Sequence, residues 1–154
     1  MVDSKIITKA TELLQALIGQ PLCYGLKSSD MNFYDFGFGK LIEETDSYGV
    51  KRKTSNYILH VTCRFKVIWK TGTCHTDKYY EDTPSEKFDS DFKDLIGLYV
   101  KRVVLSEKND LWLDFEDCWV VFATYEDGEE SWRLFFSDMS KPHIVATDLK
   151  IDLA

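Results

Sequence analysis

The segment Tyr57–Lys70, with the sequence YILHVTCRFKVIWK, has the clearest periodicity in the chain. Every second residue from Tyr57 to Trp69 is apolar, and the positions between them carry most of the polar and basic side chains. Alternate residues of a β-strand point to opposite faces of a sheet. The pattern therefore predicts one strand of 14 residues, with an apolar face and a mostly cationic face.

An amphipathic helix is expected at the N-terminus, before the strands. Apolar residues recur there at the spacing of one helical face, at Ile6, Ala10, Leu13, Leu14 and Leu17. Gly19 and Pro21 are expected to end the helix, because glycine accepts the left-handed conformation and proline cannot continue a helix. Polar residues interrupt the apolar ones, so the segment does not resemble a secretory signal, and we expect a cytoplasmic protein.

Strands joined by short turns are expected along the rest of the chain. Leu22–Lys27 and Met31–Phe38 should form a hairpin, whereas Glu43–Ser55 and Asp82–Ser90 should be loops. Further strands are expected at Leu98–Leu105, Leu111–Phe115, Cys118–Tyr125, Glu129–Phe136 and His143–Asp148. The Asp127–Gly128 pair predicts a hairpin between the strands that flank it.

One helix followed by many strands is typical of the α+β class. We expect an N-terminal helix packed on a mostly antiparallel, meander-type β-sheet or partly open barrel. The chain has 154 residues and no repeat or long linker, which predicts a single domain over residues 1–154.

Composition narrows the classes of partner. The chain has 26 acidic and 19 basic residues, a formal charge of −7, which disfavours nucleic-acid binding. No apolar run approaches the length of a membrane span. Aromatic residues make up 14% of the chain, enough for a substantial core.

Signatures of common enzymes and metal sites are missing from the sequence. It contains no G-x-S-x-G elbow, no P-loop and no H-E-x-x-H motif. His60 and Cys63 are separated by an odd number of residues, so a regular strand places them on opposite faces, away from a shared metal ion. We expect no cofactor, and reduced thiols at Cys23, Cys63, Cys74 and Cys118.

Charge is distributed unevenly along the chain. Lys51–Lys70 carries six basic residues and no acidic one, whereas Glu107–Glu130 is strongly acidic. Either the two segments lie side by side and offset each other, or the acidic one forms a face that recruits a basic protein. The candidate residues of that face are Glu126, Asp127, Glu129 and Glu130. Trp112 and Trp119, inside the acidic segment, fit either a binding hot spot or the core.

Six short segments also occur in a recognisable order. They are LIGQPL at residues 17–22, KSSDM at 27–31, LHVTCRFK at 59–66, DKY at 77–79, SWRLF at 131–135 and HIV at 143–145. In that order they resemble a family of small, uncharacterised bacterial cytosolic proteins, with the pattern L-G-x-P-L, R-A-A-D-M, L-H-x-x-C-x-W-R, D-x-Y, W-R-x-F and H-x-V. This chain departs from the pattern at Lys27 and at Phe65–Lys66, where Arg and Trp-Arg are usual.

The resemblance picks out polar and aromatic positions at Lys27, Asp30, His60, Lys66, Trp132, Arg133 and His143. It implies either a buried polar network that ties strands together or the lining of a ligand cleft. Some small acidic proteins of this kind are similar to the immunity proteins of bacterial polymorphic toxins.

The sequence thus favours a non-enzymatic binding protein, an inhibitor or immunity protein whose acidic face meets a basic protein. The alternative is a small-molecule-binding protein or an enzyme that uses a cluster of Lys27, His60, Arg133 and His143. In the second case His60 is the candidate general base.

Overall fold

A computed structural model describes residues 4–28, 32–70, 79–80, 85–138 and 140–154. Its α-helices are α1 (Ser4–Leu14) and α2 (Ser85–Phe92), each followed by a 3₁₀ turn, η1 (Gln15–Leu17) and η2 (Lys93–Leu95). The strands are β1 (Leu22–Lys27), β2 (Tyr34–Phe38), β3 (Ile42–Thr45), β4 (Lys51–Thr54), β5 (Tyr57–Val61), β6 (Arg64–Trp69), β7 (Arg102–Leu105), β8 (Leu111–Asp114), β9 (Cys118–Ala123), β10 (Trp132–Phe136), β11 (Ile144–Ala146) and β12 (Ile151–Leu153).

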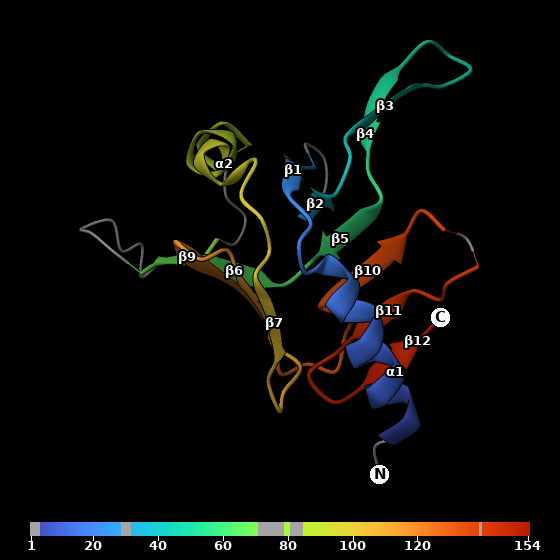
Figure 1. The fold of residues 1–154 in the computed structure, drawn as a ribbon, viewed down its shortest axis with the longest axis vertical. Coiled ribbons are helices and arrows are strands. Elements are labelled where there is room, and N and C mark those ends of the chain that lie inside the picture. Colours follow the sequence, from blue (N-terminus) through green and yellow to red (C-terminus); the bar gives the residue numbers. More distant parts are fainter. Residues whose placement is uncertain (1–3, 29–31, 71–78, 81–84, 139) are drawn as a thin grey trace.

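The strands form two main antiparallel sheets and one separate hairpin (Figure 1). The six-stranded sheet has the order β1-β2-β5-β10-β11-β12, and the four-stranded sheet has the order β6-β9-β8-β7. Strands β3 and β4 pair only with each other and extend away from the body of the molecule. The described strands form no closed barrel, and the α+β class with an N-terminal helix packed on the sheet is confirmed.

The prediction of one long strand over Tyr57–Lys70 is wrong. The segment forms β5 in the six-stranded sheet and β6 in the four-stranded sheet. Between them, the N–H groups of Thr62 and Cys63 both donate to the carbonyl oxygen of Ser131, at 2.9 and 3.1 Å. Two successive donors on one acceptor break the regular ladder, and the strand bends there as at a β-bulge.

The alternation of the segment nevertheless continues through the bend. Leu59, Val61, Cys63, Phe65 and Val67 are all buried, so the apolar face is continuous from one sheet to the other. The residues between them are partly or fully exposed. Periodicity thus gave the correct buried face but carried no signal for the change of sheet.

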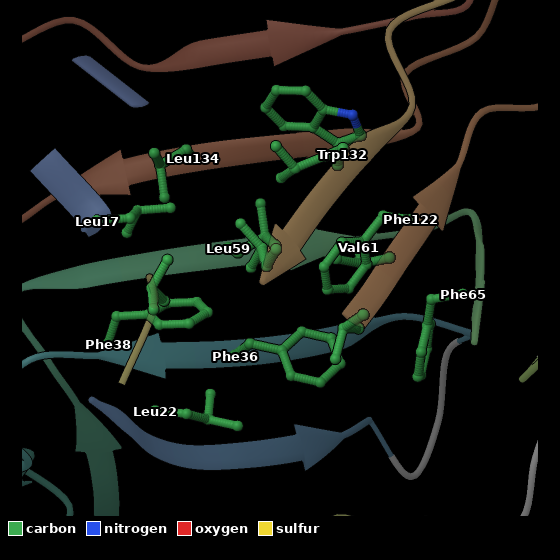
Figure 2. Close-up of a cluster of buried hydrophobic side chains, with 14 of the residues drawn as sticks. Leu17, Leu22, Phe36, Phe38, Leu59, Val61, Phe65, Phe122, Trp132 and Leu134 are labelled. Atoms are coloured by element: carbon green, nitrogen blue, oxygen red, sulfur yellow. The ribbon is translucent and has the colours of Figure 1, made fainter. Parts of the chain in front are cut away.

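The core lies where the two sheets meet, and it is mainly aromatic. The Phe65 ring of β6 lies 5.3 Å from Phe36 of the six-stranded sheet and 5.7 Å from Phe122 of β9. Helix α2 adds Phe88 and Phe92, both buried, against these rings. Figure 2 shows side chains of both sheets pointing into this one cluster.

Helix α1 confirms the N-terminal prediction. Ala10, Leu13, Leu14 and Leu17 are buried in the core, and Figure 1 shows α1 lying along β10–β12. Gly19 follows with φ +85°, the left-handed conformation expected after a helix.

The hairpin predictions have mixed outcomes. Strands β1 and β2 pair as expected. Glu43–Ser55 is not a loop, because β3 and β4 pair there through Glu43–Lys53 and Glu44–Arg52. The Asp127–Gly128 hairpin is also wrong, since the flanking strands β9 and β10 belong to different sheets.

Two further boundaries differ from the sequence analysis. Asp82–Ser90 is helical from Ser85 onward, because Phe88 and Phe92, one turn apart, bury one face of α2 in the core. Residues 82–84 lie outside the described part of the chain. The chain also continues beyond β11 into β12, whose Ile151 is buried against α1 and β11.

Candidate functional site

The outer face of the six-stranded sheet, the side away from the core, carries one row of side chains across all six strands. Strand register places them next to each other in the order Leu26, Asp35, His60, Arg133, Val145 and Asp152. We call these six residues the outer row. Two residues predicted from the sequence, His60 and Arg133, are therefore cross-strand neighbours.

His60 is held by a carboxylate and by aromatic rings. Its Nδ1 lies 2.8 Å from Oδ1 of Asp35, and both side chains are about one-quarter exposed, at 26% and 25%. Phe33 and Phe135 flank the imidazole, with ring centroids 4.7 and 6.5 Å away. An ionised carboxylate only accepts hydrogen bonds, so the Nδ1–H of His60 is the donor in this contact.

Arg133 and His143 occupy the same face as His60. The Nε and Nη2 of Arg133 donate to one oxygen of Glu130, at 3.1 and 2.6 Å. The His143 ring packs on Phe135, with centroids 4.3 Å apart. Phe135 thus lies in contact with both histidines, and the outer face combines two imidazoles, a guanidinium and the carboxylates of Asp35, Glu130 and Asp152.

The other residues picked out by the resemblance do not join this group. Lys27 lies at the end of β1, with its Nζ 5.9 Å from the Tyr34 ring centroid. Lys66 belongs to the four-stranded sheet. Trp132 is fully buried and donates from Nε1 to the carbonyl oxygen of Asn109, at 2.9 Å. Asp30 lies outside the described residues.

The predicted set is therefore neither one buried network nor one cleft. Among the described members of the set, only His60, Arg133 and His143 are brought together, on a partly exposed sheet surface. Asp35 belongs with them, although sequence reasoning missed it. Its only signal was its polar position between the apolar residues Tyr34 and Phe36, which could not show that β2 pairs with β5.

The acidic turn, Glu126, Asp127, Glu129 and Glu130, is largely occupied within the molecule. Glu126 binds Lys108 at 2.6 Å, a contact that lowers the pKa of this glutamate, and Glu130 binds Arg133. Oδ1 of Asp127 accepts the N–H of Glu129 at 2.9 Å. Within the described part of the chain, Asp127 and Glu129 have no basic group within 4.0 Å.

Other acids of the Glu107–Glu130 segment also meet cations. Asp114 is buried and binds both Lys70, at 2.6 Å, and Arg102, at 2.8 Å. Burial would raise the pKa of Asp114, but hydrogen bonds from Lys70, the Glu116 N–H and Arg102 lower it below its ordinary value. Since β6 also pairs with β9, the basic and acidic segments lie side by side, as one of the two interpretations predicted.

The outer face of the four-stranded sheet carries the two tryptophans of the acidic segment. The rings of Trp112 and Trp119 meet edge to face, 5.9 Å apart, and neither belongs to the buried core. Lys70 and Arg102 each lie 5.0 Å from the Trp119 ring centroid. Val104, which is 45% exposed, is the cross-strand neighbour of Trp112. We call these five residues the tryptophan face.

The described cysteines are poorly suited to act as nucleophiles. Cys23, Cys63 and Cys118 are free thiols, whereas Cys74 lies outside the described residues. Burial raises the pKa of Cys63 and of Cys118 to about 12, so both stay protonated at neutral pH and are weak nucleophiles. No group of three His, Cys, Asp or Glu side chains that could hold a metal ion occurs among the described residues.

Comparisons with known proteins identify neither a family nor a function for this chain. The chain matches no protein-family model, no curated protein is similar to it, and no solved structure matches it. Within the described ranges, neither helix has the length and apolar character needed to cross a bilayer.

Proposed function

We propose that this protein is a non-enzymatic binding protein and that the tryptophan face holds its protein partner. The observation that carries the proposal is the Trp112–Trp119 pair, which lies outside the core and has two cations against the Trp119 ring. Protein interfaces are enriched in Trp and Arg, and their hot spots are often such aromatic and cationic anchors.

The charge of the tryptophan face favours an acidic partner. Lys70 and Arg102 bring two positive charges, and the buried Asp114 beneath them brings one negative charge. The sequence analysis favoured a basic partner at the acidic turn, where Glu126 and Glu130 each bind a cation of this chain, and binding there is the competing outcome of affinity capture. As in the sequence analysis, the class of binding protein that we propose is an inhibitor or immunity protein.

Affinity capture with matched variants tests the proposal. The tagged protein is incubated with a lysate of its source organism at low and at high salt, and retained proteins are identified by mass spectrometry. Val104→Glu adds a negative charge beside Trp112 on an exposed edge strand, and Trp119→Ala removes an anchor. Val50→Glu, at a 58% exposed valine beside β4, is the matched control.

We expect one acidic protein that is retained at low salt, lost with Val104→Glu and Trp119→Ala, and kept with Val50→Glu. A partner lost only when Asp127 and Glu129 are changed to Lys would instead assign binding of a basic protein to the acidic turn. Retention of no specific protein under either condition would overturn the proposal.

The second candidate function is small-molecule binding or catalysis at the outer row. The observation in its favour is that His60, Asp35 and Arg133 are neighbours, with His143 close by. Titration of the imidazole resonances with a library of small acids and esters tests this function. Ligand-induced shifts that disappear in His60→Gln would support small-molecule binding at the outer row. If neither the His60 nor the His143 imidazole responds to any ligand, this candidate function is contradicted.

A further inference from the structure

Arg64 lies at the start of β6 on the outer side of the four-stranded sheet, among tyrosine rings. Its guanidinium carbon is 4.7 Å from the Tyr79 ring centroid and 5.8 Å from that of Tyr125. These three residues border a hollow of about 470 Å³, which Lys108, Asp110, Thr124 and Glu126 also line. Stacked rings hold a guanidinium by its faces and leave its N–H edges for other partners.

One of those N–H groups has no acceptor in the part of the chain that the structure describes. The Nε of Arg64 is buried and makes no hydrogen bond to any described residue. Arg52, Arg102 and Arg133 each bind a carboxylate, at 3.4, 2.8 and 2.6 Å respectively. Buried donors in native proteins nearly always have a partner, so an unpaired one points to an acceptor that is supplied from outside the chain.

The carboxylates that line the hollow are already engaged. Oδ1 of Asp110 accepts hydrogen bonds from the backbone N–H and the hydroxyl of Thr124, at 2.8 and 3.0 Å. Glu126 binds Lys108 at 2.6 Å. The chain therefore leaves Arg64 without an ion-pair partner within 4.0 Å among the described residues, even though two acids lie in the same hollow.

A second cation lies beside Arg64. Lys66, two residues further along β6 and on the same face, has its Nζ 4.7 Å from the Tyr79 ring centroid. It too has no carboxylate within 4.0 Å among the described residues. Arg64 and Lys66 thus both lie against Tyr79, and two positive charges at one ring favour a group with more than one negatively charged oxygen.

We propose that Arg64 and Lys66 form a binding site for an oxyanion, the phosphate or carboxylate group of a small ligand that enters the hollow beside Tyr79. The guanidinium supplies directed N–H donors, including the unpaired Nε–H, and Lys66 supplies a mobile second charge. Asp110 and Glu126 also line the hollow, but Glu126 is paired with Lys108 and Asp110 accepts from Thr124, which moderates their repulsion of an anion. This inference does not rest on the proposed function.

Nuclear magnetic resonance tests the site directly, because the Nε–H of each arginine gives its own signal. The ¹⁵N-labelled protein is titrated with inorganic phosphate, and in parallel with succinate, at constant ionic strength with sodium chloride as the blank. The backbone amides of Ala123, which pairs with Arg64, and of Thr124 report on the site when Arg64 is replaced. Variants are Arg64→Lys, Arg64→Gln and Lys66→Gln, with Arg52→Lys as a control at a paired arginine on the separate β3–β4 hairpin.

We expect saturable shifts of the Arg64 Nε–H and of the two reporter amides, with either phosphate or succinate. Affinity should fall about tenfold or more in Arg64→Gln, and in Arg64→Lys as well, because a lysine lacks the fork of donors. Lys66→Gln should weaken phosphate binding, and Arg52→Lys should leave it unchanged.

The relative response to the two probes identifies the group: tighter phosphate binding assigns a phosphate ester, and tighter succinate binding assigns a carboxylate. An Arg64 Nε–H that responds no more than it does to sodium chloride would overturn the proposal. Shifts that persist in both Arg64 variants would overturn it as well, and Arg64→Lys keeps this outcome accessible should Arg64→Gln fail to fold.

Discussion

The segment Tyr57–Lys70 contributes one strand to each sheet, and the outward side chains of these two strands differ in how their charges are paired. On β5, His60 is paired with Asp35 and lies next to the Arg133–Glu130 pair. On β6, Arg64 and Lys66 rest on aromatic rings and, within the described residues, have no carboxylate partner. The same alternation therefore gives β5 a polar side chain that is paired within the protein and gives β6 two cations, Arg64 and Lys66, without a carboxylate partner among the described residues.

The difference teaches that strand neighbours, more than strand composition, decide what a polar face can do. The residue opposite His60 on β2 is Asp35, whereas the residue opposite Arg64 on β9 is Ala123. Alanine offers neither charge nor bulk, which leaves room for the hollow beside Tyr79 and for a ligand. Both faces nonetheless rest on one shared core.

The largest expected effect concerns that core. Phe65→Ala should lower the free energy of unfolding by about 3–5 kcal/mol, because it removes a fully buried ring between the two sheets. Urea denaturation followed by both circular dichroism and tryptophan fluorescence measures this loss. The two probes should give coincident transitions, since the two sheets share one hydrophobic core. Separate transitions would mean that the two sheets unfold independently and would contradict the shared core.

A smaller effect is expected at the buried carboxylate of the four-stranded sheet. Asp114→Asn should cost about 2–3 kcal/mol, because Lys70, Arg102 and the Glu116 N–H all donate to this side chain. Urea denaturation at pH 7 measures the loss. A cost below about 0.5 kcal/mol, typical of exposed pairs, would contradict the role assigned to Asp114.

The same variant makes a prediction for pH. The pKa of Asp114 is lowered in the folded protein, so its contribution to stability is fully present above the ordinary aspartate pKa of about 3.9. This stabilisation is lost as the pH falls from there through the lower pKa of the folded state. The stability difference between the wild type and Asp114→Asn should therefore stay constant from pH 7 to about pH 5 and shrink below about pH 4. A difference that grows with acidity would contradict this assignment.

The smallest effect is expected on the six-stranded sheet. Asp35→Asn should cost less than about 1 kcal/mol, because the Asp35–His60 pair is partly exposed and water replaces the lost contact. Thermal unfolding at neutral pH, beside Asp114→Asn as the matched variant, measures the contrast between the two sheets. Equal losses for Asp35→Asn and Asp114→Asn would remove the distinction.

The sequence was informative where a pattern reflects local geometry. The period of the α1 face and Gly19 predicted the N-terminal helix, and the alternation around Phe65 predicted the buried side of β5 and β6. Such patterns depend only on the spacing of residues along one element. They cannot show which sheet a strand joins, which is why the change of sheet at Thr62–Cys63 and the separation of β9 from β10 were missed.

The candidate site was less predictable, because it depends on pairings between distant strands. His60 and Arg133 were identified, yet their relation follows only from the register of β5 with β10, and Asp35 enters only through β2. Lys66 was identified without Arg64 as its companion. The unpaired Nε of Arg64 is a property of three-dimensional packing and leaves no trace in residue type or spacing. The tryptophans had two open interpretations until the outer face of β8 and β9 was known.

The path of the chain through the two sheets also bears on how the protein is made. Strand β5 needs β10 to cover its free edge, and Val61 finds its partner Trp132 only when most of the chain has been synthesised. Until then, a ribosome-bound nascent chain holds β1, β2 and β5 as an open template on which another nascent copy can add a strand. Slow translation of residues 62–131 would therefore favour aggregation during synthesis, and chaperone capture of that intermediate would raise the yield of folded protein.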